Sequence, residues 1–191
     1  MAVLSYSDIL PKKIIKYNEE PYEVLSSHIF RMQMRKPVNQ TKLRHLVSGK
    51  VLEISFHQNE TIEEAEIDTM QATYLYTNRG ESWFAEEGNP KNRFSFPDTV
   101  VHTQVQWLAT NSVVEVLTYE EKPVTIKIPI KVDLEVREAP PNVKGDTSSG
   151  GNKVVTLTTG ATVQVPLFIN NGDIIRINTD TGEYAERVTK A

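Results

Sequence analysis

The chain has 191 residues, of which 39% are hydrophobic, and a formal net charge of −4. These values are ordinary for a folded globular protein and leave room for one large domain or two to three small ones. The absence of cysteine excludes disulfides, thiolate metal sites and cysteine nucleophiles. Residues 1–17 do not resemble a signal peptide, because charged residues interrupt every apolar run, so we expect a cytoplasmic protein that does not contact a membrane.

Short runs rich in Val, Ile, Thr and Tyr recur along the chain and are separated by Gly, Pro, Asn and acidic turns. This pattern predicts an all-β protein built of barrels or sandwiches. The predicted strands are 12–17, 22–26, 42–46, 51–56, 72–76, 113–117, 124–128, 132–137, 154–158, 162–166 and 173–178.

One segment is predicted to be helical. Asp98 follows a proline and can cap the start, and Val101, Val105 and Leu108 then recur at helical spacing. The two tryptophans, Trp83 and Trp107, are expected in the core of the second module, because both are large and apolar in strand-like and helical contexts respectively.

Two changes of composition divide the chain. An acidic run from Glu60 to Asp68 follows a basic first third, and the segment 129–141 precedes a last third rich in Gly, Ser and Thr. We therefore expect three small β modules, near 1–64, 65–128 and 129–191. Modules of about 60 residues bury a limited core, so neighbouring modules are expected to dock against one another.

Charge is concentrated in one stretch of the first module. Between Val24 and Leu52 there is no carboxylate, and removing the basic residues of this stretch from the total of 21 Lys and Arg leaves 15 against 25 Asp and Glu. Clustered cations favour an anionic target such as nucleic-acid phosphate, although a solvated basic hairpin fits the charge equally well. The basic residues are Arg31, Arg35, Lys36, Lys42, Arg44 and Lys50.

Several segments taken together match the pattern of one known protein family. The most specific match is the last third, where the sequence from Gly145 to Lys153 leads into the run from Thr158 to Phe168 and then to Thr181-Gly182-Glu183-Tyr184 and Arg187. Family-like spacing also holds in the first two thirds, at Glu20-Pro21-Tyr22, Lys42-Leu43-Arg44, Gly49-Lys50-Val51, Thr73-Tyr74-Leu75-Tyr76 and Trp107. With these segments the chain resembles bacterial elongation factor P over essentially its whole length.

The resemblance implies an architecture and a role. The expected fold is a KOW-like or SH3-like barrel followed by two OB-type barrels in an L-shaped, tRNA-like arrangement. The expected partners are the 70S ribosome, its rRNA and the peptidyl-tRNA, beside which a monomeric factor relieves stalling at consecutive prolines. A loop next to the tRNA acceptor end would restore a productive geometry, and catalysis would stay with the ribosome.

That loop corresponds here to Arg31, Met32, Gln33, Met34, Arg35 and Lys36. Relatives usually carry at its tip a lysine, or in some members an arginine, that is enzymatically extended and flanked by glycines. Counting from both sides places Met34 at the tip, and methionine offers neither an amine nor a guanidinium. Three interpretations remain open: an unmodified tip with apolar Met side chains and phosphate-binding cations, a one-residue shift that puts Arg35 at the tip, or a paralogue with altered duty.

The resemblance also places Gly145, Asp146 and Thr147 on a loop facing the small subunit and the exit-site codon, with Tyr184 and Arg187 on the nearby last strand. Tyr184 is equally well explained as a core aromatic with an exposed hydroxyl. Lys42, Arg44 and Lys50 are the expected tRNA and rRNA contacts.

The chain shows neither metal-ligand spacing among its histidines nor a Ser/His/Asp grouping, so we expect no enzyme, no metal and no cofactor. A rival hypothesis is a generic OB-fold protein that binds single-stranded RNA on exposed aromatic side chains. The basic stretch holds a single Phe, Tyr or Trp residue, Phe30, and the rest of the chain is acidic, which disfavours the rival.

Overall fold

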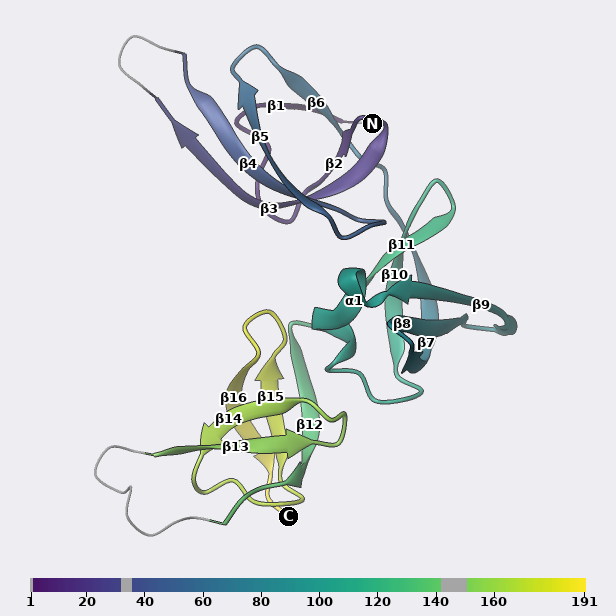
Figure 1. The fold of residues 1–191 in the computed structure, drawn as a ribbon, viewed down its shortest axis with the longest axis vertical. Coiled ribbons are helices and arrows are strands. Elements are labelled where there is room, and N and C mark those ends of the chain that lie inside the picture. Colours follow the sequence, from purple (N-terminus) through teal and green to yellow (C-terminus); the bar gives the residue numbers. More distant parts are fainter. Residues whose placement is uncertain (1, 32–35, 142–150) are drawn as a thin grey trace.

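The computed structural model describes residues 2–31, 36–141 and 151–191. Its strands form three sheets, each built from one part of the chain, and paired strands run antiparallel. Figure 1 shows the sheets following one another along a bent path, with the second sheet at the bend. The expected all-β architecture is confirmed.

The first sheet has six strands in the order β1-β6-β2-β3-β4-β5. They are β1 (Val3–Ser5), β2 (Ile14–Tyr17), β3 (Glu20–Phe30), β4 (Val38–His45), β5 (Val51–His57) and β6 (Thr61–Glu64). Along β4 the side chains alternate, so that Asn39 and Leu43 are buried while Lys42 is exposed. The Asn39 amide donates hydrogen bonds to the carbonyls of Tyr6 and Ile9, which fastens the segment before β2 over the core.

The second sheet has five strands in the order β11-β10-β7-β8-β9. Its elements are β7 (Asp68–Asn78), β8 (Glu81–Glu86), β9 (Asn89–Pro97), α1 (Asp98–Val105), β10 (Val113–Tyr119) and β11 (Lys122–Lys127). The predicted helix is confirmed, and Val101, Val105 and Leu108 pack in the core that the sheet and helix share.

The expected capping role of Asp98 is wrong. Pro97 occupies the cap position, and no side chain of the described residues caps the helix, whereas Asp98 is the first helical residue. Its carboxylate lies 3.2 Å from Nδ1 of His102, one turn further on. A carboxylate in the first turn still complements the helix dipole, so Asp98 favours this helix start from within rather than by capping it.

The third sheet has five strands in the order β14-β13-β12-β15-β16. They are β12 (Lys131–Glu138), β13 (Asn152–Leu157), β14 (Thr162–Pro166), β15 (Ile174–Asn178) and β16 (Glu183–Thr189). The inner faces of these strands form the third core, which includes Val136, Leu157 and Ile175.

Neither tryptophan lies in the core of the second module, so both expectations are wrong. Trp83 is half-buried on β8, where its neighbour Phe84 fills the core instead. Trp107 follows α1 by two residues, and its side chain is buried in the third core. Its ring also covers the turn between β15 and β16, where a Cβ added to Gly182 would lie 3.5 Å from it. Trp107 thus joins the second and third sheets through apolar packing.

The first sheet meets the others through polar and backbone contacts. Lys12 Nζ lies 2.9 Å from Asp180 Oδ2, an exposed ion pair between the first and third sheets. Gly49 approaches the start of α1 so closely that an added Cβ would lie 2.7 Å from the carbonyl oxygen of Thr99. Gly49 also has a φ of +70°, which favours glycine, so this close approach depends on the absence of a side chain.

All eleven predicted strands are confirmed, with shifts of a few residues at their ends. Five others were not predicted: β1, β6, β8, β9 and β16. Of these, β1, β9 and β16 are edge strands. β1 has only three residues, and β9 and β16 are mostly polar. β6 lies within the acidic run that was interpreted as a module boundary.

Candidate nucleic-acid interface

The basic stretch folds as the hairpin of β3 and β4, extended by β5. In the register of this hairpin Phe30 pairs with Val38, His28 with Gln40, and Ser26 with Lys42. Lys42 and His28 are exposed, and Phe30 is half-buried. The outer face of the hairpin therefore offers both aromatic and cationic side chains.

The predicted loop lies at the end of this hairpin. Met32, Gln33, Met34 and Arg35 lie outside the described residues. The two flanking positions, Arg31 and Lys36, are exposed, and Lys36 Nζ lies 3.5 Å from Oδ1 of Asn59.

His28 and Phe30 form an aromatic pair that was not predicted from the sequence. Their ring centroids are 6.4 Å apart and the rings are nearly parallel, at 23°. The signal for this pair was present, because residues two apart on a strand point to the same face. A flat, partly exposed pair beside cations can stack against a nucleobase.

In the folded protein, carboxylates from neighbouring strands lie beside the basic stretch. Strand pairing sets Glu23 opposite Arg44 and Glu53 opposite Lys42, although both acids lie outside the carboxylate-free segment of the sequence. Arg44 Nη2 lies 2.5 Å from Glu23 Oε2, and both side chains are about three-quarters buried. Arg44 therefore adds little net positive charge to the outer face.

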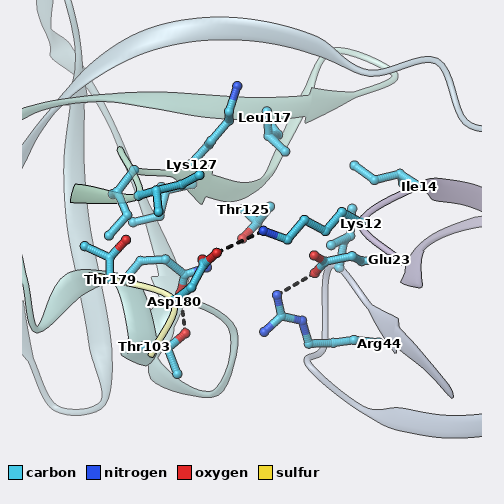
Figure 2. A pocket seen from close by; sticks show the side chains of 15 residues that line it. Lys12, Ile14, Glu23, Arg44, Thr103, Leu117, Thr125, Lys127, Thr179 and Asp180 are labelled. Carbon is cyan, nitrogen blue, oxygen red and sulfur yellow. Dashed lines mark hydrogen bonds and ion pairs between the residues drawn. The ribbon is translucent and has the colours of Figure 1, made fainter. Parts of the chain in front are cut away.

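Arg44 also points away from the loop end. It lines a hollow of about 520 Å³ where the three sheets meet, together with Lys12, Thr125 and Asp180. Figure 2 shows Arg44 beside Glu23 and Lys12 beside Asp180 in this hollow. The hydrogen bond from Lys12 to Asp180 raises the pKa of the lysine, which stays protonated.

The predicted cations of the hairpin are spread along its length rather than gathered. At about 3.3 Å per residue, Arg44 lies roughly 20 Å from the loop end of β4. Lys50 is exposed in the turn that precedes β5, at the opposite end from the loop. Lys36 and Arg31 flank the loop, and Lys42 is exposed between the two ends.

Only some of the predicted residues of the third module belong to the part of the chain that the structure describes. Gly145, Asp146 and Thr147 lie outside the described residues. Tyr184 on β16 is half-buried and packs against the third core, in agreement with its interpretation as a core aromatic.

Arg187 is held by its own sheet. Its Nη1 lies 3.5 Å from Asp173 Oδ2, and its guanidinium carbon lies 5.1 Å from the ring centre of Phe168. Phe168 is exposed, so this cation-π pair forms an outward-facing feature of the third sheet.

Asp173 anchors the end of the chain. Its side chain is 1% exposed, and it accepts hydrogen bonds from the backbone N–H groups of Asn170 and Ala191. Burial alone would raise the pKa of Asp173, but these two donors and the nearby Arg187 charge outweigh burial and lower it. The carboxylate therefore stays ionised and fixes Arg187 on the surface of β16.

Among the described residues no group of His, Cys, Asp and Glu side chains could hold a metal ion. In that same part of the chain, no helix is long and apolar enough to cross a membrane.

Comparison with known proteins identifies the family. Residues 5–62 match the model of the elongation factor P KOW-like domain, and residues 132–187 match that of the elongation factor P C-terminal domain. The elongation factor P of Thermodesulfovibrio yellowstonii is 37% identical over 97% of this chain and 99% of its own length. The chain belongs to the elongation factor P family.

Other similar proteins include the elongation factor P of Fervidobacterium nodosum, which is 36% identical over 97% of this chain and all of its own. Among solved structures, eukaryotic translation initiation factor 5A from Methanococcus jannaschii has a TM-score of 0.49 at 9% identity, over 66% of this chain and 92% of that one. This last likeness is too slight to bear on function. Family membership makes the protein a translation factor of the elongation factor P type.

Proposed function

We propose that this protein binds the 70S ribosome beside the peptidyl-tRNA and promotes peptide bond formation at consecutive prolines. The observation that carries the proposal is full-length similarity to elongation factor P, together with exposed cations on both sides of the loop. The protein would act in the cytoplasm as a monomer, without catalytic chemistry of its own. It would use the three proposed domains, 1–64, 65–128 and 129–191, to span the site.

The proposed mechanism is one of positioning. Prolyl substrates orient poorly for peptide transfer, and holding two reactants in a productive geometry lowers the barrier without covalent chemistry. Arg31 and Lys36 would hold phosphates on either side of the loop, and Lys42, Lys50 and the His28–Phe30 pair would extend the RNA contact along the hairpin. The loop itself would then rest against the tRNA acceptor end.

Experiments on the loop tip can distinguish the open interpretations of Met34. If the tip works unmodified, protein made without any partner enzyme shows its encoded mass and speeds polyproline synthesis in a reconstituted translation system. Met34→Ala then loses most of this activity but still binds the ribosome, because the phosphate contacts remain. Full activity of Met34→Ala with an inactive Arg35→Ala would instead put Arg35 at the tip.

Salt dependence of ribosome binding tests the cationic side chains individually. Removing one cation that binds a phosphate should flatten the slope of log affinity against log salt by about 0.7 to 0.9. We expect this change for Lys36→Ala and Lys42→Ala and a smaller one for Arg44→Ala, whose charge Glu23 already neutralises. Lys131→Ala, exposed on the third sheet, is the matched control. An unchanged slope for both hairpin lysines would reject the hairpin as the RNA-binding surface.

The third domain would contribute contacts near the exit-site codon. Asp146→Ala and Thr147→Ala should leave thermal stability nearly unchanged but reduce polyproline rescue, and Gly145, Tyr184 and Arg187 would belong to the same contact. Normal rescue by both variants would remove these positions from the proposed interface.

Two alternatives predict different results. A generic binder of single-stranded RNA would sediment with free RNA as well as with ribosomes and would not depend on proline codons. A paralogue with altered duty would bind ribosomes but fail to rescue polyproline synthesis.

A further inference from the structure

The outer face of the second sheet carries a pair of aromatic side chains that lie outside the three hydrophobic cores formed by the described residues. Tyr76 on β7 pairs directly with Trp83 on β8. Their ring centroids are 6.5 Å apart with 29° between the ring planes, so the rings are close to parallel. Tyr76 is 46% exposed and Trp83 is half-buried.

A β-bulge brings Tyr76 to this face. Strand alternation would set Tyr76 on the same side as Tyr74, which is buried in the second core opposite Phe84. The register shifts between these two tyrosines, so that Tyr76 pairs with Trp83, the residue before Phe84. Bulges re-aim side chains in this way and are often found at functional positions.

The surroundings of the pair are polar. Ser95 on β9 lies directly opposite Trp83, and Arg93, two residues earlier on the same strand, is exposed. Glu81, two residues before Trp83, accepts a hydrogen bond from Ser95. β9 is an edge strand, and Figure 1 shows β8 and β9 on the side of the second sheet away from the first and third sheets.

These features fit a small flat ligand better than a protein surface. A stable protein interface buries about 800 Å² on each partner and is centred on a contiguous apolar patch. Here two rings lie among Ser95, Arg93 and Glu81. Parallel aromatic rings suit an unpaired base, which has an apolar face, and a nearby guanidinium suits the phosphate of the same nucleotide.

We propose that the Tyr76–Trp83 pair binds an unpaired base of single-stranded RNA, with Arg93 at the adjoining phosphate. This site lies on the second sheet and is separate from the hairpin and third-domain surfaces of the proposed function. Double-helical RNA does not fit, because its bases are stacked on one another and withdrawn from such a surface.

Tryptophan fluorescence reports on the site directly. The chain has two tryptophans, and Trp107 is 5% exposed in the third core, so quenching by a stacked base arises at Trp83. The full chain is titrated with a short oligoadenylate and with an abasic oligomer of the same length and charge. We expect saturable quenching by the oligoadenylate and much weaker quenching by the abasic oligomer.

Variants separate stacking from charge. Tyr76→Ala should weaken oligoadenylate binding about tenfold, as expected when one of two stacking rings is removed, whereas Tyr76→Phe should retain the affinity. Arg93→Ala should reduce the salt dependence of oligoadenylate binding but keep the preference for the oligoadenylate over the abasic oligomer. Val113→Ala, exposed on the neighbouring strand β10, is the control and should change nothing. Circular dichroism checks that each variant is folded.

Three results would overturn the proposal. Equal quenching by both oligomers, or an unchanged affinity of Tyr76→Ala, would show that no base stacks on the pair. Loss of ribosome binding by Tyr76→Ala without any binding of free RNA would assign the face to a protein partner instead. The measurement on free RNA does not require polyproline activity, so its outcome is independent of the proposed function.

Discussion

Truncation of Trp107 is expected to destabilise the third sheet, although the residue belongs to the segment that follows α1. Burying about 200 Å² of an aromatic side chain, at about 25 cal/mol per Å², stabilises by about 5 kcal/mol. The indole Nε1 of Trp107 is buried and has no hydrogen-bond partner among the described residues, which costs about 1–2 kcal/mol. The expected loss for Trp107→Ala is therefore about 3–4 kcal/mol, within the range for such truncations in cores.

The measurement must resolve the sheets from one another, because a molecule with three cores need not unfold in one step. Native-state hydrogen exchange gives a free energy of opening for the amides of each strand. For Trp107→Ala we expect the loss on β12 and β15, which line the third core, and a smaller change on β7. Denaturant unfolding followed by far-ultraviolet circular dichroism should show an earlier transition for the third sheet alone.

The second tryptophan provides a matched control. Trp83→Ala removes the same side chain from a half-buried surface position and should cost clearly less. Trp107→Phe removes the unpartnered N–H along with part of the ring, so it should cost less than Trp107→Ala. An equal loss for Trp83→Ala, or a loss at Trp107 confined to the second sheet, would refute the assignment of Trp107 to the third core.

Three further outcomes are expected. Asp173→Asn should lower the stability at neutral pH and weaken the dependence of stability on pH in the acid range. Because folding lowers the pKa of Asp173, its carboxylate stabilises the protein fully above the unfolded pKa of about 3.9, and this stabilisation is lost as the pH falls through the folded pKa. Thermal melts across that pH range measure the effect. Gly49→Ala should destabilise the contact with α1 by more than Gly88→Ala, since both glycines have positive φ but only at Gly49 would a Cβ meet backbone, and denaturant midpoints compare them. Asp180→Lys should separate the first sheet from the third by repelling Lys12, seen as a larger radius of gyration at low salt that added salt reverses.

The strand pattern was readable in most strands that bury one face, although β8, which buries Phe84, was missed. β5, β10 and β14 alternate or are rich in Val and Ile, and all three were predicted close to their observed bounds. The edge strands β9 and β16 were missed because their polar sequences resemble turns. Edge position alone does not explain these misses, because β5 and β14 are edge strands too. Those two were predicted because apolar and polar residues alternate along them.

The hairpin that carries the candidate site was predictable, but the surroundings of its cations were not. The carboxylate-free stretch predicted a basic hairpin, and β3 and β4 form it with Lys42 exposed. It could not indicate that Arg44 is paired with Glu23 across the strands and turned toward the hollow between the sheets. Net charge along a sequence ignores which residues become neighbours, and in a sheet those neighbours come from the adjoining strands.

By itself, the sequence determined the all-β class, the helix after Pro97, the elongation factor P family and the unusual methionine in the loop, because each depends on local pattern or residue type. Tertiary structure alone decided which core each tryptophan enters, which cations are neutralised and which aromatic rings face solvent. Trp107 fills the third core because the chain crosses the junction there, and Tyr76 faces outward because a single bulge reverses the alternation. Both outcomes depend on contacts between segments distant in sequence, and no local pattern encodes them.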